Sequence, residues 1–511
     1  MHRQDYTPLR KPLHSVPLAV VELVVLAGAV SQVHSFALDP VTVVRHTDAG
    51  QGIGVDSGSG VPISADSVAA TAPRTVTEFA KITPSDGYPI SFGASISVSG
   101  DDLVVGAPAF FTEEGMVGTA YVFHRVGPRW VETGKLFVSF GAIEGEGLGW
   151  SVAIEGDYIV VGAPQFIGAP AVGGGYGRVF IFRRDDRGTP DDPFDDQWWR
   201  WSELRTPDEI RWGDNYGASV DISDGVVLIG KPGGSLITGA SGSAYLYRNV
   251  NGHWRHVGSL YPSDSHFGDQ FGDAVSLSGP VALIGASRHI EGGIISGAAY
   301  VFRETISGWS QEAKLLPNAE PGRGLFGTRV SVASDQAVVG GSADLDPWPA
   351  AGTAYVYMAG ESPWSNQTKL RGTETYDMET FGRAVAIAAN SIVVGAPGQN
   401  SHFGAAYIFQ RDASRWVEKC KLIASHRPST AVLGASVAVN EKYAFAGAQE
   451  AVFVYVLPSA AKSLRDYSDF QSCFRGEERE LVAECAKFDL APDGRIDLRD
   501  FNELLATLAG P

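Results

Sequence analysis

Basic residues are scarce in this 511-residue sequence. Its 40 lysines and arginines are outnumbered by 58 aspartates and glutamates, which gives a formal net charge of −18. Nucleic acids and anionic membranes are bound by clustered basic side chains, so this balance argues against both as partners. The acidic excess keeps the protein soluble, and a second interpretation is that some carboxylates hold divalent cations.

Cysteine is almost absent, which excludes a framework of disulfides as the source of stability. Only Cys420, Cys473 and Cys485 occur. Cys473 and Cys485 lie in one short C-terminal segment, and we expect them to pair if the compartment is oxidising. Cys420 lies in a repeated segment described below, at a position that is Gly, Ala or Thr in other copies of the repeat. We therefore expect it to be buried and unreactive.

Long apolar runs are missing except near the N-terminus. Residues 16–30 are apolar apart from Glu22, follow basic residues, and precede small residues suited to cleavage. This pattern predicts a signal peptide over 1–37, with a poorly ordered linker over 38–74. A disordered tail or an uncleaved anchor is the alternative. No other segment is apolar enough to cross a membrane, so we expect a secreted, extracellular or cell-surface protein, with the periplasm also open.

Motifs for catalysis are missing as well. There is no G-x-S-x-G elbow and no phosphate-binding loop of the Walker type. The eleven histidines are scattered, with His266 and His289 in turns, and none has the spacing of metal ligands. We therefore expect no enzyme, although paired carboxylates contributed by distant segments stay open.

What the sequence does contain is a repeat of about 55 residues. An aromatic residue or Leu followed by Gly recurs seven times, and a second Gly stands 14 residues after each start. The seven starts are Phe92, Leu148, Tyr216, Phe271, Phe326, Phe381 and Leu433. Between the two positions lie β-branched and small residues, and a pair of aromatic residues spaced by two follows. Such runs are typical of short strands joined by tight turns.

Each unit is predicted to form four strands, of which the last carries a Trp with a Leu six residues later. Small residues on the first strand place it nearest a crowded centre. A single unit cannot bury both of its faces, whereas seven units around an axis can. The sequence therefore predicts an all-β fold, a seven-bladed propeller of four-stranded blades over 75–458.

The last unit lacks its Trp–Leu strand, and a matching strand, Val76–Ile82, precedes the first unit. We expect this N-terminal strand to complete the last blade and close the ring. A linear array of repeats has no use for such an exchange.

The series Phe-Gly, Val-Val-Gly-Ala-Pro and Gly-x-Ala-Tyr-Val-Phe resembles the FG-GAP repeats of integrin α-subunit propellers, and more closely those of bacterial FG-GAP repeat proteins. The resemblance implies an extracellular propeller used for binding. The Asp-rich calcium loop of integrin-type repeats is missing from these hairpins, so we expect no calcium in the blades. An insert with six aspartates over 185–196 is interpreted as a solvated loop, with calcium binding as the alternative.

Residues 459–511 change to a helical pattern and are predicted to form a small α-helical module. The stretch Asp489–Asp500 resembles an EF-hand-type loop, and its final Asp resembles dockerin modules. This likeness implies Ca²⁺ held by Asp489, Asp493, the carbonyl of Arg495, Asp497 and Asp500. Position three of the loop is Ala491, which removes one ligand, so a metal-free helical hairpin is the alternative.

The sequence thus favours a non-catalytic extracellular binding protein that takes a protein or carbohydrate ligand on a propeller face. Two alternatives are kept open. One is a secreted polysaccharide hydrolase or lyase with a dockerin-like appendage, and the other is a structural cell-surface protein.

Overall fold

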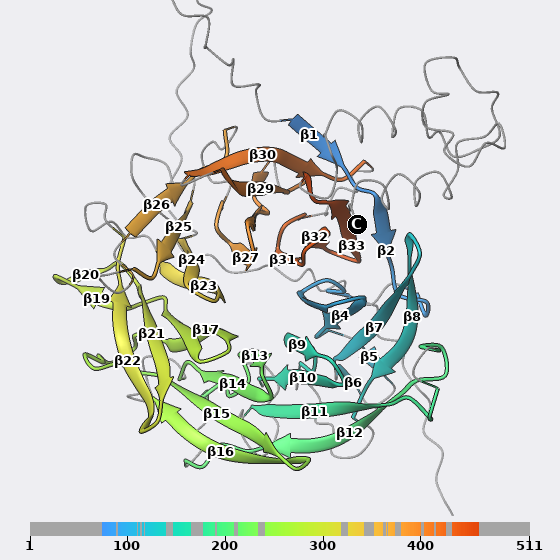
Figure 1. Cartoon of the computed structure of the whole chain (residues 1–511), viewed down its shortest axis with the longest axis horizontal. Helices are drawn as coiled ribbons and strands as arrows, with labels where there is room; N and C mark the ends of the chain where they lie inside the picture. Colours follow the sequence, from blue (N-terminus) through green and yellow to red (C-terminus); the bar gives the residue numbers. More distant parts are fainter. Residues whose placement is uncertain are drawn as a thin grey trace, which may run out of the picture. The chain divides into compact units, whose positions relative to one another are not determined.

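The computed structural model describes residues 74–458, with internal gaps of which the longest are 165–176 and 342–351. The expected signal peptide, most of the linker and the C-terminal module lie outside the described residues. Within them the named elements are β-strands. They form seven sheets in which four strands lie side by side and antiparallel, and the sheets are arranged around a centre (Figure 1).

The first four blades use strands in chain order, and blades one and four also carry a two-stranded hairpin. Blade one has β3 (Ser95–Ser99), β4 (Asp102–Ala107), β7 (Thr119–Val126), β8 (Arg129–Leu136) and the hairpin β5 (Phe111–Thr112) and β6 (Gly115–Met116). Blade two has β9 (Ser151–Glu155), β10 (Tyr158–Ala163), β11 (Arg178–Asp185) and β12 (Gln197–Leu204). Blade three has β13 (Ser219–Ser223), β14 (Val226–Lys231), β15 (Ser243–Val250) and β16 (His253–Leu260). Blade four has β17 (Phe271–Ser278), β18 (Val281–Ala286), β21 (Ala298–Thr305), β22 (Gly308–Leu315) and the hairpin β19 (Ile290–Glu291) and β20 (Ile294–Ile295).

The last three blades complete the ring. Blade five has β23 (Phe326–Ala333), β24 (Gln336–Gly341), β25 (Thr353–Met358) and β26 (Asn366–Leu370). Blade six has β27 (Ala384–Ala388), β28 (Ser391–Ala396), β29 (Ala405–Asp412) and β30 (Arg415–Ile423). Blade seven has β31 (Ser436–Val439), β32 (Tyr443–Ala448), β33 (Ala451–Val456) and β2 (Ala80–Ile82), which comes from the other end of the described chain.

The first strand of each blade lies innermost and the fourth lies at the rim, as expected from the small residues on the first strand (Figure 1). The second strand is buried on both of its faces: Leu103, Val104 and Val105 of β4 have no exposed surface. Side chains on both faces of a sheet are covered only when the sheet is packed between neighbours, so the apolar second strands follow from the stacking of the blades.

The aromatic residue of each repeat start packs edge-on against the aromatic pair of its own blade. In blade one the Phe92 ring centroid lies 5.4 Å from that of Tyr121 and 6.0 Å from that of Phe123. Blades four, five and six repeat this cluster with Phe271, Phe326 and Phe381 at nearly the same distances. The period of two in the aromatic pair puts both rings on one face, where the third ring covers them.

The two repeated glycines bring neighbouring blades into backbone contact. A Cβ added to Gly285 in blade four would overlap the carbonyl oxygen of Gly327 in blade five, and the other six pairs behave alike. These pairs are Gly106–Gly149, Gly162–Gly217, Gly230–Gly272, Gly340–Gly382, Gly395–Gly434 and Gly447–Gly93. Any larger residue would push the blades apart, which explains why both positions are glycine.

Serine side chains link the innermost strands across the same boundaries. Ser95 Oγ donates to the carbonyl of Gly149, and Ser151 Oγ donates to that of Gly217. The last blade repeats this bond to the first: Ser436 Oγ lies 2.6 Å from the carbonyl oxygen of Gly93. The ring is therefore closed by the same contacts that join its other blades.

The N-terminal strand closes the ring as expected, but it is shorter than the sequence suggests. Strand β2 pairs antiparallel with β33 and completes blade seven. Residues 74–77 form a separate strand, β1 (Arg74–Thr77), which pairs parallel with β30 at the rim of blade six. The chain changes partner at Glu78, whose carboxylate accepts hydrogen bonds from the backbone N–H and the hydroxyl of Ser425. This N-terminal segment thus joins blades six and seven.

Candidate binding site on the loop-rich face

One face of the ring carries the long connections. Because the strands of a blade alternate in direction, the loops between second and third strands leave the same face as the linkers to the next blade. In blade four this loop is residues 287–297, whereas residues 224–225 alone join β13 to β14 on the opposite face. We call the side with the long connections the loop-rich face. Loops on a rigid scaffold are where binding residues usually lie.

A cavity of about 610 Å³ opens at the centre of the ring, where the innermost strands begin on the loop-rich face. A cavity of this volume is within the range of small-molecule or side-chain pockets. Its wall is built largely from the residues that follow each repeated Phe-Gly, Leu-Gly or Tyr-Gly.

The sevenfold repeat is broken in the wall of this cavity. The residue after the repeated Gly is alanine in blades one, three and seven (Ala94, Ala218 and Ala435). In blades two, four and six it is Trp150, Asp273 and Arg383, and blade five contributes Arg329 from the next position. Residues that depart from a structural repeat are not needed to build it, which makes them the best candidates for function.

Two arginines from neighbouring blades give one side of the cavity a positive charge. Burial, and after it the charge of Arg383, lowers the pKa of the Arg329 guanidinium to about 10, so it stays cationic at neutral pH. The Arg383 side chain is exposed and makes no hydrogen bond or ion pair with any described residue. Asp273 is the carboxylate among the described lining residues, and it accepts a hydrogen bond from Ser287 Oγ at 2.7 Å.

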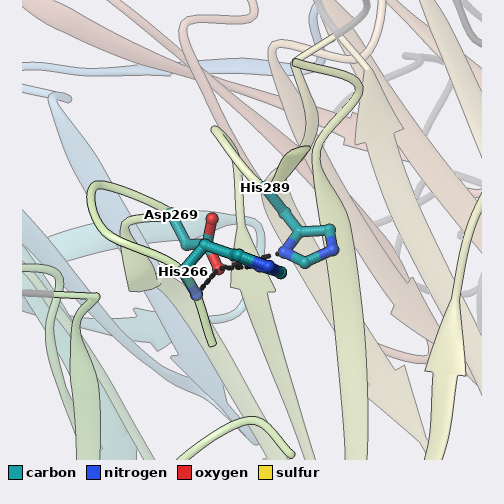
Figure 2. Close-up of side chains that lie close together, drawn as sticks. All are labelled: His266, Asp269 and His289. Carbon is teal, nitrogen blue, oxygen red and sulfur yellow. Dashed lines mark hydrogen bonds and ion pairs between the residues drawn. The ribbon is translucent and has the colours of Figure 1, made fainter. Parts of the chain in front are cut away.

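A second polar group lies on the same face in blade four, where Asp269 and His289 are buried together. Both are 1 % exposed, and His289 Nδ1 lies 3.0 Å from Asp269 Oδ2 (Figure 2). The neighbouring His266 ring is largely exposed, with its Nδ1 4.0 Å from the same oxygen. Asp269 and His266 come from the linker between blades three and four, and His289 comes from the loop after β18.

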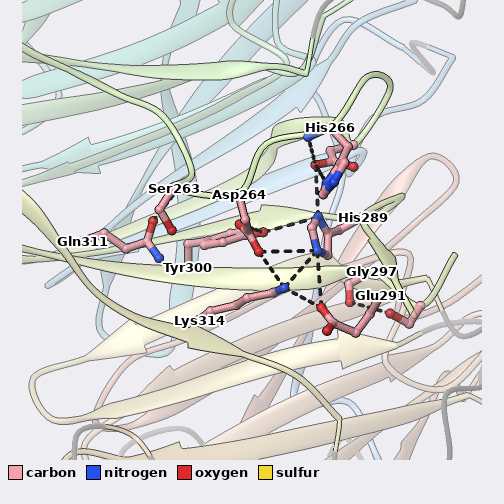
Figure 3. A network of polar contacts seen from close by, with 11 residues as sticks. Ser263, Asp264, His266, His289, Glu291, Gly297, Tyr300, Gln311 and Lys314 are labelled. Atoms are coloured by element: carbon pink, nitrogen blue, oxygen red, sulfur yellow. Dashed lines mark hydrogen bonds and ion pairs between the residues drawn. The ribbon is translucent and has the colours of Figure 1, made fainter. Parts of the chain in front are cut away.

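The other nitrogen of His289 faces a cluster of charged groups. Lys314 Nζ lies 2.9 Å from His289 Nε2, 2.7 Å from Asp264 Oδ2 and 2.5 Å from Glu291 Oε2 (Figure 3). Burial lowers the pKa of Lys314, but its hydrogen bonds to Asp264 and Glu291 raise it more, so the pKa is held above its usual value. The hydrogen bond to Lys314 holds the pKa of the Glu291 carboxylate below its usual range. Lys314 is therefore an ammonium ion that donates to His289 Nε2.

The structure brings together histidines that are scattered in the sequence. His289 is buried, and its group with His266 and Asp269 is the one set of three potential metal ligands that the described residues bring together. Spacing along the chain did not reveal it because two separate loops supply the ligands. Alignment of the repeats could have indicated that His289 points into its blade, because Gln399 of blade six occupies the same position. Gln399 donates a hydrogen bond to Tyr407 OH, and His289 lies beside the equivalent Tyr300 OH.

The aspartate-rich insert is anchored by local hydrogen bonds. Asp186 and Asp192 accept hydrogen bonds from backbone N–H groups two residues ahead, and Asp195 accepts one from Thr189 Oγ1. The side chain of Asp196 is 6 % exposed and pairs with Arg184 at 3.2 Å. Turn hydrogen bonds account for Asp186, Asp192 and Asp195, and an ion pair accounts for Asp196.

Cys420 is buried, as expected from its alignment with small residues. It is 1 % exposed, and burial raises the pKa of its thiol to about 12. The thiolate needed for reaction is therefore not formed near neutral pH. Cys473 and Cys485, like the calcium ligands proposed at Asp489, Asp493, Arg495, Asp497 and Asp500, lie outside the described residues, and both assignments stay predictions.

Thiol counting tests the proposed disulfide. We expect the native protein, purified without reductant, to show no thiol that reacts with a water-soluble reagent, because Cys420 is buried and Cys473 is paired with Cys485. Denaturation without reductant should expose one thiol, and denaturation with reductant should expose all three cysteines. Two reactive thiols in the native protein would contradict the pairing, and a Cys420→Ala variant assigns the buried one.

The repeats match a known family. Residues 76–123, 130–182, 254–302, 309–357 and 364–409 match the FG-GAP repeat. Each match starts near the fourth strand of one blade and ends in the third strand of the next. The first three strands of blades three and seven fall outside these matches, yet both blades have the same four strands as the others. The described residues therefore form a seven-bladed propeller in which five repeats match FG-GAP.

Comparison with individual proteins adds a distant likeness to an integrin. The chain is 31 % identical over 138 residues to integrin alpha-7 of Rattus norvegicus, a stretch that covers 27 % of this chain and 12 % of the integrin. The crystal structure of Chaetomium thermophilum Sqt1 superposes with a TM-score of 0.43 at 12 % identity, over 75 % of this chain and 98 % of that one. Within the described residues no helix has the length and apolar character needed to cross a membrane.

Proposed function

We propose that this protein is a secreted, non-catalytic interaction protein that binds an acidic protein partner at the centre of its loop-rich face. The central cavity carries this proposal, because Arg329 and Arg383 depart from the repeat and line the same opening. The likeness to an integrin supports an extracellular location, although it covers only a small part of that protein.

The charge of the cavity selects the ligand. The Arg383 side chain makes no hydrogen bond or ion pair with the described residues. The Arg329 guanidinium uses one nitrogen, Nη1, to donate to the carbonyl of Thr328 at 2.7 Å. A carboxylate from a partner would gain charge-assisted hydrogen bonds from both guanidinium groups. The exposed ring of Trp150 on the same wall offers an apolar surface beside them, a combination common in recognition pockets.

The single carboxylate in the described lining of the cavity favours binding over hydrolysis. Cleavage of a glycosidic bond by the usual mechanism needs two carboxyl groups that flank the bond. Asp273 is the single carboxylate among the described lining residues, and it is held by Ser287. This arrangement supports a binding site.

Replacing Arg383 with Gln is expected to weaken the binding of acidic peptides by roughly tenfold or more, since a hydrogen bond to a charged group contributes about 1.5–3 kcal/mol. Arrays of glutamate-rich, neutral and lysine-rich peptides, followed by titration of the best binder, provide the measurement. The wild-type protein should prefer the glutamate-rich set, and added salt should weaken this preference.

The matched control is Arg255→Gln, which removes an exposed arginine from β16 at the rim of blade three. Its affinity should equal that of the wild type. If no acidic peptide binds, or if both variants bind equally well, the cavity is not the site. Competition by a free uronic acid but not by free glutamate would show that the carboxylate belongs to a carbohydrate instead.

A further inference from the structure

We infer that blade four holds a zinc-type metal ion on the loop-rich face, bound by His266, Asp269 and His289. This inference goes beyond the proposed function and does not depend on it. One nitrogen from each histidine and one oxygen from Asp269 all lie within 4.8 Å of one another (Figure 2). Two imidazoles and a carboxylate form a donor set that suits zinc, with a further coordination position open to water.

The geometry is close to that of a bound site. Atoms that share one tetrahedral zinc at about 2.0 Å are roughly 3.3 Å apart. The His289 Nδ1 to Asp269 Oδ2 distance is 3.0 Å and the His266 Nδ1 to Asp269 Oδ2 distance is 4.0 Å. The two buried ligands therefore need almost no movement, and the exposed His266 side chain can swing toward them by a rotation of its own.

An unsatisfied buried oxygen points to a missing ligand. Asp269 Oδ1 is buried and has no hydrogen-bond partner among the described residues. A buried carboxylate oxygen without a donor is costly and needs an explanation. A cation held by both oxygens of this carboxylate, Oδ2 beside the histidines and Oδ1, would supply the missing partner.

The charges around His289 decide on which side the metal binds. Lys314 fills the space between Asp264 and Glu291 on the Nε2 side (Figure 3). Its ammonium group excludes a second cation there, so the metal takes Nδ1 beside Asp269. Metal bound at Nδ1 displaces the proton of that nitrogen, and the neutral ring carries its proton on Nε2 instead. Lys314 Nζ, which donates to Nε2 in the metal-free site, then turns away from Nε2 and stays paired with Asp264 and Glu291. The Nε2–H group lies 3.5 Å from Glu291 Oε2 and 3.7 Å from Asp264 Oδ2. A carboxylate that accepts the second N–H of a metal-bound histidine is a common feature of zinc sites.

The site would also stiffen the wall of the central cavity. Asp269 is followed directly by Gln270, which lines the cavity and accepts a hydrogen bond from Ser287 Oγ. The same hydroxyl proton is shared with Asp273 Oδ2, which is the nearer acceptor at 2.7 Å. A metal that joins the linker to the loop after β18 thus holds two cavity residues in place.

Zinc titration of the tag-free full chain, stripped of metal with a chelator and kept in excess calcium, tests the site. We expect one zinc per chain with an affinity in the micromolar range or tighter, and a cobalt-substituted protein with the visible absorption of a four-coordinate site. His266→Ala and His289→Gln should each weaken zinc binding by more than about 100-fold, beyond the usual effect of outer-shell changes. Gln is compatible with the fold there because Gln399 fills the same position in blade six.

His253→Ala, which removes an exposed histidine of β16, is the matched control and should bind zinc like the wild type. Thermal unfolding of each variant verifies that it is folded. His266→Ala changes an exposed side chain, so it still tests the site if His289→Gln does not fold. No zinc binding by the wild type, unchanged affinity in the site variants, or a loss in only one of them would overturn the three-ligand site.

Discussion

A chain that begins after Ile82 is expected to lose more than about 3 kcal/mol of stability toward denaturant, because β2 is the fourth strand of blade seven. Ile82 is 4 % exposed, and full burial of such a side chain contributes about 1.5–3 kcal/mol. Phe79 and Val76 pack against the same core and add to the loss. Denaturant unfolding followed by tryptophan fluorescence measures it.

Two further chains separate the roles of the N-terminal strands. A chain that begins at Arg74 keeps β1 and β2 and should unfold like the full chain. A chain that begins at Glu78 loses only β1, so the ring stays closed and the loss should be much smaller. Adding a peptide of residues 74–82 should restore stability to the shortest chain, since it can bind the open edge of β33. Equal stability of all three chains would contradict closure by β2.

Replacing Gly285 with Ala is expected to destabilise the protein by about 3 kcal/mol or more, which is the upper range for overpacking. The added methyl group would meet the backbone carbonyl of Gly327 in the next blade, and a backbone cannot rotate away as a flexible side chain can. The whole boundary between blades four and five has to shift to admit it. The free energy of unfolding measures the effect.

Gly258→Ala is the matched control. Gly258 also lies in a strand, but a Cβ there would sit 3.5 Å from Leu246 Cδ1, an ordinary contact. This variant should be neutral or slightly stabilising. Ala lowers the conformational entropy of the unfolded chain relative to Gly, which stabilises the folded protein by about 0.4–1 kcal/mol. If both variants unfold alike, close approach of the blades is not the reason for the repeated glycines.

The repeat predicted the fold in detail because each of its residues has a physical task in every blade. The Phe-Gly start supplies a ring for the aromatic pair and a glycine for the blade boundary, as Phe92 with Tyr121 and Gly106 with Gly149 show. Periodicity of two and a fixed register are local properties, so they can be read from one sequence. The missing fourth strand of the last unit predicted the closed ring for the same reason.

The departures from the repeat were harder to interpret. Val76 was expected to extend the strand of blade seven, but β1 pairs with β30 instead. The strand that β1 pairs with depends on which outer strand has an open edge, and in this ring that strand is β30 of blade six. The sequence of residues 74–82 carries no information about that edge. The partner of the segment was decided by the ring.

The chain by itself determined the seven repeats, the four strands in each, the burial of Cys420 and the identity of the strand that closes the ring, because these depend on patterns within about 55 residues. Only the tertiary structure decided the two candidate sites. Arg329 and Arg383 come from different blades, and His266, Asp269 and His289 come from different loops. Closing a ring brings side chains together from positions that no spacing along the chain relates, and the chemistry of a site depends on that proximity.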